Sequence, residues 1–182
     1  MTQPPHAEVE LDLTAPVPHG PEERTAFRLA QLLVLLTVAH DMQADIRTVD
    51  RLAYYEFFAA NPFVAVSGAN EKDIEDRLDL RLAGFLEGQL TYATAGQRFI
   101  GRRQRLQHDL ALLIAYGLAE VTDKGYSVTQ LGLDTATRLE AQYKDQYSRS
   151  AHVILGRLRR LSDRRLREKA ASGQPSSDVS PA

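Results

Sequence analysis

The pattern of apolar and polar positions divides the first third of this chain into helices. Residues 21–40 are predicted to form a helix in the middle of the fold, because apolar side chains cover most of its circumference. A second helix should begin after Thr48, a good N-cap residue, and end near Asn61 because Pro62 follows. Residues 63–68 are expected to be extended or looped.

The next predicted helix is capped by Asn70 and runs to about Glu87. Its apolar residues have helical spacing and should form the buried stripe, which consists of Ile74, Leu78, Leu82 and Phe85 or Leu86. The same segment carries the carboxylates of Glu71, Asp73, Glu75, Asp76 and Asp79. Their spacing matches no calcium loop, so a solvated acidic face is favoured over a metal site.

Residues 101–132, GRRQRLQHDLALLIAYGLAEVTDKGYSVTQLG, have the order of elements of a winged helix. A helix is predicted from about Arg102 to a left-handed cap at Gly117. Its buried stripe should consist of Leu106, Leu110, Leu113 and Ile114. Two short strands should then pair around a turn in which Gly125 supplies the positive φ, and Thr129 should cap the following helix.

A long basic helix is predicted over residues 134–170, because apolar residues keep a spacing of three or four through this segment. The stripe consists of Leu139, Tyr143, Tyr147, Ile154, Leu158 and Leu161. Residues 148–150 and Gly156 are its expected points of interruption. A stripe that continues beyond the globular part suggests packing on another chain, for example in a homodimer.

These elements together predict a mainly α-helical fold with N-terminal helices, a winged helix made of a helix-turn-helix and a short β-hairpin, and a long C-terminal helix. The Pro-rich residues 1–20 should form a flexible arm, and residues 21–133 a helical domain that ends in the winged helix. The basic helix would follow over 134–170 and a disordered tail over 171–182, which is small, polar and contains proline.

Composition narrows the classes of function. The chain of 182 residues has no cysteine, which excludes disulfides and thiolate metal sites. Its most apolar run, residues 29–39, is shorter than the roughly 20 residues of a membrane span, and no signal peptide begins the sequence. We therefore expect a cytoplasmic protein with no membrane contact. Scattered histidines and the lack of a phosphate loop or nucleophile motif predict no enzyme activity, no metal and no cofactor.

Charge is distributed unevenly although the net charge is only −2. Residues 151–182 carry seven basic and three acidic side chains, which leaves 15 basic and 21 acidic side chains in the rest of the chain. The basic segment suits a nucleic acid or an acidic protein surface, with plain solubility as the alternative. The acidic body argues against a protein that clamps duplex DNA by itself.

Six residues are candidates for nucleic-acid contact. In a winged helix, the helix predicted here from about Arg102 to Gly117 enters the major groove, where Arg and Gln read the edges of G and A. The tip of the hairpin can meet a phosphate. The set is Arg102, Arg103, Gln104, Arg105, Gln107 and Lys124. The alternative is a solvated helix start whose arginines pair with acidic residues elsewhere.

Eight further residues are candidates for protein contact, namely Tyr54, Tyr55, Phe57, Phe58, Leu158, Arg159, Arg160 and Leu161. The four aromatic residues fall within five positions, and no single face of a helix holds them all. One or two of them should therefore meet a neighbour or a partner.

The segments TVDRLAYYEFFAANPF, RRQRLQHDLALLIAYGLAEV and YSVTQLG resemble the middle components of bacterial ABC-three component systems, the Lamassu-type defence modules. The similar span is about residues 24–165. The resemblance implies a non-catalytic winged-helix adaptor between an SMC/Rad50-like ATPase and an effector subunit, acting in antiviral or anti-plasmid defence. The alternative from the residues themselves is a winged-helix transcription regulator that binds DNA as a dimer.

Overall fold

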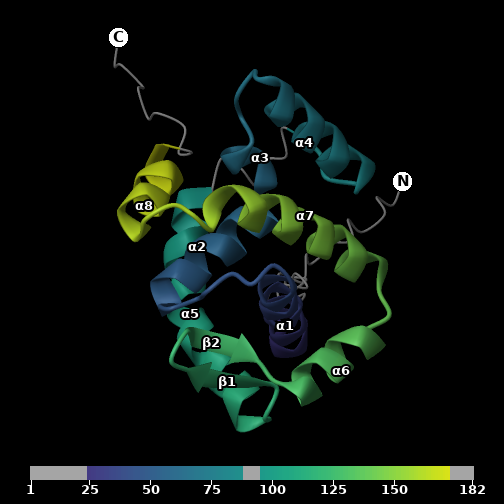
Figure 1. The fold of residues 1–182 in the computed structure, drawn as a ribbon, viewed down its shortest axis with the longest axis vertical. Helices are drawn as coiled ribbons and strands as arrows, with labels where there is room; N and C mark the ends of the chain where they lie inside the picture. Colours follow the sequence, from purple (N-terminus) through teal and green to yellow (C-terminus); the bar gives the residue numbers. More distant parts are fainter. Residues whose placement is uncertain (1–23, 88–94, 173–182) are drawn as a thin grey trace, which may run out of the picture.

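The structure is a computed structural model that describes residues 24–87 and 95–172. It is mainly α-helical with a two-stranded antiparallel sheet, as predicted. The predicted arm over residues 1–20 and most of the predicted tail lie outside the described residues. Figure 1 shows α1 (Thr25–Asp41) in the middle and α7 (Gln142–Leu158) crossing above it. The β-hairpin and α4 (Glu71–Leu82) lie at opposite ends of the molecule.

Helix α1 (Thr25–Asp41) is the central element, which confirms the prediction from its all-round apolar pattern. Its residues from Gln31 to Leu36 are all buried. The elements that pack around it are α5 (Ala95–Ala115), α6 (Gln130–Arg138), α7 and strand β2 (Gly125–Val128). Because neighbouring elements enclose this helix, it does not need a polar face toward water, which explains its all-round apolar pattern.

Helix α2 (Val49–Ala60) begins with the predicted cap, because the Thr48 hydroxyl accepts a hydrogen bond of 3.1 Å from the N–H of Arg51. It is buried from Leu52 to Ala59 between α5, α7 and α8. Of the two expectations for its aromatic residues, contact with a neighbour or with a partner, the first applies, because neighbouring helices of the same chain cover them and none is left at the surface for a partner. The chain's own core covers all four, Tyr54, Tyr55, Phe57 and Phe58.

Residues 62–65 form a single helical turn, α3 (Pro62–Ala65), and residues 66–69 have no regular structure, so the expected extended piece or loop over 63–68 is wrong only up to Ala65. Helix α4 (Glu71–Leu82) has the predicted cap, since the Asn70 side chain accepts a hydrogen bond from the N–H of Asp73. It ends before the predicted Glu87 because Gly84, at φ 95°, reverses the chain.

The burial of α4 is the reverse of the prediction. Four apolar residues of the expected stripe are exposed, namely Ile74, Leu78, Leu82 and Leu86, and of that stripe Phe85 alone is buried. The inner face of the helix holds Asp73, Asp76 and Leu80. Arg157 of α7 causes this inversion, because its guanidinium donates hydrogen bonds to both aspartates and to the carbonyl of Lys72.

Helix α5 (Ala95–Ala115) starts earlier than predicted and buries Leu106, Leu110 and Leu113, whereas Ile114 is partly exposed. Gly117 is left-handed, at φ 70°, and the hairpin of β1 (Ala119–Thr122) and β2 (Gly125–Val128) follows as predicted. Gly125 has φ 106°, and a Cβ there would lie 2.1 Å from the carbonyl oxygen of Ile46.

The predicted long C-terminal helix is wrong, because the chain turns twice. Helices α6 (Gln130–Arg138), α7 (Gln142–Leu158) and α8 (Asp163–Ser172) replace it, and the expected interruptions at 148–150 and Gly156 lie inside α7. Arg51 supports the second turn by donating hydrogen bonds to the carbonyls of Arg159 and Leu161. The apolar stripe packs on α1 and α2 of the same chain, so it is not left over for a second copy.

Candidate nucleic-acid interface

The outer face of α5 carries no described acidic group. From Arg102 onward, its exposed side chains are Arg103, Gln104, Arg105, Gln107, His108, Ala111, Ile114 and Ala115. The helix contains a single carboxylate, Asp109, which is buried and accepts two hydrogen bonds from Arg28, of 2.7 and 3.0 Å. Hydrogen bonding to Asp109 raises the pKa of Arg28. Among its described residues, the solvent side of α5 thus presents cationic, amide, imidazole and small groups together with Ile114, and no carboxylate.

Arg102 does not belong to this outer face, contrary to the prediction. Its guanidinium lies 2.5 Å from the carboxylate of Glu56 and donates a hydrogen bond of 2.7 Å to Gln31. Gln31 in turn donates to the hydroxyl of Tyr143 at 3.0 Å. Arg102 is therefore used inside the fold, where it compensates a buried carboxylate.

Arg103 and Arg105 lie on opposite flanks of the outer face, as their spacing of two residues requires. The guanidinium of Arg103 reaches α2 and donates hydrogen bonds of 2.9 and 2.5 Å to Asp50, and this pair is about half exposed. Gln104 and His108 lie between the flanks, one turn apart. The predicted candidates other than Arg102 thus lie on the surface, and Arg103 marks the edge of α5 that faces α2.

A second group of basic residues, separate from Arg103 and Arg105 of α5, lies where α7 ends and α8 begins. Its exposed arginines are Arg159, Arg160, Arg164, Arg165 and Arg167. Arg159 donates a hydrogen bond of 2.6 Å to the carbonyl of Met42, which fixes this corner against the end of α1. Of the predicted protein-contact residues in this segment, Leu158 is buried and Leu161 packs against the core, so only the two arginines are available at the surface.

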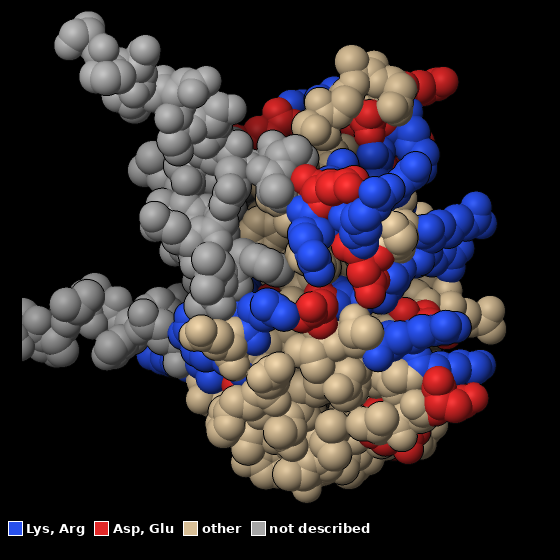
Figure 2. All heavy atoms as spheres, turned by 90° about the vertical axis from the view of Figure 1, so that its left-hand side faces the viewer, with Lys and Arg blue, Asp and Glu red and all other residues tan. Residues whose placement is uncertain are grey.

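The first turn of α2 brings these two basic groups together. Asp50 binds Arg103 of α5, and the neighbouring Arg51 forms an ion pair of 2.6 Å with Asp163 at the start of α8. Arg51 is also held by the hydroxyl of Tyr55 at 2.8 Å. Figure 2 shows the result on this side of the molecule, where Lys and Arg gather across the middle with Asp and Glu between them.

A hollow of about 470 Å³ lies beside this turn, and we call it the arginine hollow. It is lined by Gln43, Ala44, Asp45, Arg47, Arg51, Arg159 and Arg160. A second hollow of about 580 Å³ shares Gln43, Ala44 and Asp45 with the first and continues to Lys124 on the hairpin. The two hollows therefore connect the C-terminal arginines with the tip of the hairpin.

Arg47 and Arg51 also belong to this surface, although they are not among the predicted site residues. The only local signal is a basic pair on either side of the cap residue Thr48, because the C-terminal basic segment is distant in the sequence. The first turn of a helix also offers unpaired backbone N–H groups, which favour anions. Arg47 is the most exposed of the paired arginines near the hollow, and its partner Asp45 is about half exposed.

The described residues offer no evident site for a metal, since they contain no group of three or more His, Asp or Glu side chains that could hold one. Within the same residues, no helix has the length and apolar character needed to cross a membrane. Comparison with known protein families, curated proteins and solved structures gives no significant match.

Proposed function

We propose that this chain is a non-catalytic winged-helix adaptor subunit that holds protein partners on duplex DNA. The observation that carries the proposal is the meeting of two basic segments on the first turn of α2, through the pairs of Asp50 with Arg103 and of Arg51 with Asp163. The sequence separates these segments by more than fifty residues, so the charge pattern alone leaves them as unrelated groups.

The order of the elements supports the winged-helix part of the proposal. Helices α1, α2 and α5 precede the hairpin, and a backbone hydrogen bond of 2.9 Å from Tyr126 to Ile46 ties the hairpin to the segment between α1 and α2. In this reading α2 and α5 are the two helices of a helix-turn-helix, and α3 and α4 are inserted between them. Helix α5 is then the one that enters a major groove.

The excess of acidic residues outside the C-terminal segment is a weaker argument against DNA binding once the fold is considered. The C-terminal arginines lie beside α2, and the carboxylates Glu56, Asp73, Asp76 and Asp109 are buried against arginines. A binding surface is judged by its local charge more than by the net charge of the chain. Backbone contact through the arginine hollow and Lys124, beside α5 in the groove, is the geometry we propose.

The resemblance to middle components of ABC-three component systems supplies the partners that we expect. These are an SMC/Rad50-like ATPase and an effector subunit, with the defence function that follows from them. An adaptor of this kind needs no sequence preference, because phosphate contacts carry none.

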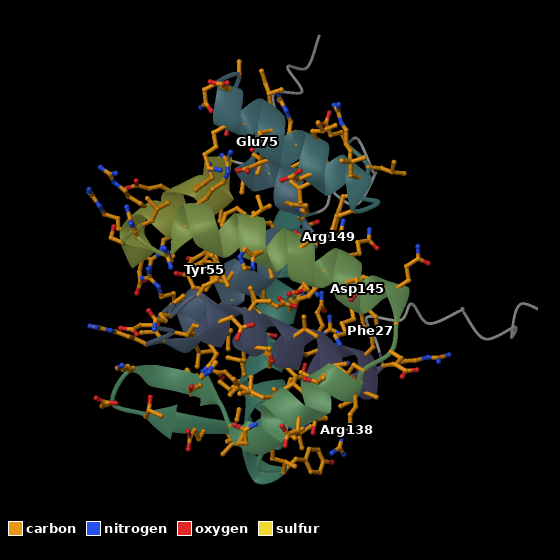
Figure 3. The ribbon with its side chains drawn as sticks, turned by 45° about the vertical axis from the view of Figure 1, so that its right-hand side comes forward. Phe27, Tyr55, Glu75, Arg138, Asp145 and Arg149 are labelled. Atoms are coloured by element: carbon orange, nitrogen blue, oxygen red, sulfur yellow. The ribbon has the colours of Figure 1, made fainter. Side chains whose placement is uncertain are left out.

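The test is the salt dependence of binding to a short duplex of random sequence, measured by fluorescence anisotropy. Arg47→Ala, Arg103→Ala and Arg160→Ala should each weaken binding and reduce the slope of log affinity against log salt by about one. The matched control is Arg149→Ala, an exposed arginine that Figure 3 labels on α7, away from α8. Equal slopes for all four variants, or no binding at low salt, would overturn the proposal.

The second candidate is the sequence-specific regulator, and the acid-free outer face of α5 favours it. This candidate expects one duplex sequence to bind about 10³-fold or more tightly than random DNA. It also expects Gln104→Ala and Gln107→Ala to remove that preference while leaving the salt slope unchanged. Selection of binding sequences from a random pool that returns no enriched motif excludes the regulator and leaves the adaptor.

A further inference from the structure

Helix α4 presents an apolar row to solvent. Ile74, Leu78 and Leu82 are spaced by four residues, so they line up along one side of the helix, and they are 55%, 54% and 72% exposed. Leu86, just beyond the helix, is also exposed. Aligned apolar residues that stay exposed in the folded chain are a mark of an interaction surface, whereas single ones are common anywhere.

The fold holds this row outward by a specific arrangement. The inner face of α4 carries Asp73 and Asp76, which are 5% and 6% exposed, and both accept hydrogen bonds from Arg157 of α7. Lys72 adds an ion pair of 3.2 Å to Asp76. A rotation of α4 that buried the leucines would pull both aspartates away from Arg157, so the outward position is fixed by polar contacts.

Acidic side chains run along one side of the row. Glu71, Glu75 and Asp79 are exposed and are also spaced by four, and no ion pair among the described residues engages them. Glu75 is labelled on α4 in Figure 3. On the other side Arg81 is already paired with Glu87, at 2.8 Å. The surface thus combines a row of leucine and isoleucine with one acidic flank.

We propose that α4 binds an amphipathic helix of a partner protein, whose apolar row packs on Ile74, Leu78 and Leu82 and whose flanking lysines or arginines pair with Glu71, Glu75 and Asp79. This mode places an apolar helix face against another, and the charged flanks set its direction. The inference rests on the adaptor function proposed above and names the chemistry of the partner surface.

A second copy of this chain fits the surface less well. In an antiparallel pair of α4 helices related by a two-fold axis, the acidic flank of one copy lies against the acidic flank of the other. In a parallel pair, the acidic flank would meet Arg77 and Arg81, and Arg81 already has a partner. A partner with its own basic flank avoids both difficulties, because opposite charges then face each other along the helix.

The experiment uses two synthetic fluorescent peptides of about 18 residues, long enough to form a helix, with the same leucine row and with either lysines or glutamates on the flank. The full chain should bind the lysine peptide. Leu78→Ser should weaken this binding by at least about tenfold, as for a central interface residue. The matched control is Leu131→Ser on α6, where the leucine is 55% exposed, and it should bind like the natural chain.

A charge-reversed chain, Glu71→Lys with Glu75→Lys and Asp79→Lys, should prefer the glutamate peptide. Equal binding of both peptides, or no binding of either, would overturn the proposal. So would a dimer in sedimentation that Leu78→Ser converts to a monomer, because the occupant would then be a second copy. DNA binding is measured on the same variants: if it persists while the peptides fail, the docking inference is wrong and the DNA-binding part of the proposed function stands.

Discussion

Two helices of equal length, α2 and α4, meet the rest of the molecule in opposite ways. Both have 12 residues and a side-chain cap. Helix α2 is enclosed from Leu52 to Ala59 and buries every aromatic ring that it carries. Helix α4 contacts the body mainly through α7 and turns Ile74, Leu78 and Leu82 to solvent. The comparison shows that the apolar content of a helix does not decide which of its faces is buried.

Arginines from neighbouring helices decide it in both cases. Glu56 is buried in α2 because Arg102 of α5 lies 2.5 Å away, and Asp73 and Asp76 are buried in α4 because Arg157 of α7 binds both. A carboxylate without such a partner would be too costly to bury. The orientation of each helix therefore depends on a cation that is distant in the sequence.

The largest expected effect on stability concerns α2, the enclosed helix of the comparison. Phe58→Ala should lower the free energy of unfolding by about 3–5 kcal/mol, because it leaves a cavity among well-packed side chains. Urea denaturation followed by circular dichroism measures it. Leu82→Ala on α4 is the control and should change stability by less than about 0.5 kcal/mol, since this side chain is 72% exposed. Similar losses for both variants would contradict the assigned burial.

The next effect concerns the attachment of α4. Arg157→Ala should cost about 3 kcal/mol, because Asp73 would stay buried without a cation and Asp76 would keep only the exposed Lys72. Burial by itself would lower the pKa of Arg157, but hydrogen bonds to both aspartates outweigh it and raise the pKa, so the charged form is the one that holds α4.

The measurement that separates local from global loss is amide hydrogen exchange. In the Arg157→Ala variant, protection should fall first in α4 and little in α2. Adding Asp73→Asn and Asp76→Asn should restore part of the stability, because an amide is less costly to bury than an unpaired carboxylate. Arg149→Ala on the exposed side of α7 is the matched control, and a loss as large as that of Arg157→Ala would contradict the role of the clamp.

The features that the sequence predicts correctly are local ones. The caps at Thr48, Asn70 and Thr129, the left-handed Gly117 and the turn at Gly125 each depend on a few neighbouring residues. The C-terminal helix could not be divided correctly, because Arg51 supports the turn after α7 from 108 residues away. Periodicity alone continues through such a turn, since Leu158 at the end of α7 and Leu161 in the turn keep the spacing of three.

The sequence predicts only part of the candidate site, because the rest depends on contacts between residues that are distant in the sequence. Arg103, Gln104, Arg105, Gln107 and Lys124 are exposed, although the first four lie in the middle of α5 and not, as predicted, at its start. Arg102 is adjacent to Arg103 in the sequence, but a rotation of about 100° on the helix turns it toward Glu56 instead. The contribution of Arg47 and Arg51 requires the position of α8, which no local pattern contains.

The smallest expected effect concerns a buried side-chain oxygen close to α2 that no hydrogen bond from the described residues compensates. The hydroxyl of Tyr147 is buried and has no hydrogen-bond partner among the described residues, and it lies on α7 close enough to Glu56 to feel its charge. Burial, with Glu56 and Tyr143 adding to it, raises the pKa of Tyr147 well above its usual value of 10.0. Tyr147→Phe removes this atom and should stabilise the fold by about 1 kcal/mol.

The same substitution should change how stability depends on pH. Below the unfolded pKa of 10.0, tyrosine is neutral in both states and Tyr147 adds no pH dependence. As the pH rises above that value, the unfolded chain ionises while the folded one does not, so stability falls. Tyr147→Phe should therefore lose less stability than the natural chain between neutral pH and about pH 11. Tyr116→Phe, at an exposed position, should follow the natural chain, and a steeper loss in Tyr147→Phe would show that the hydroxyl is compensated after all.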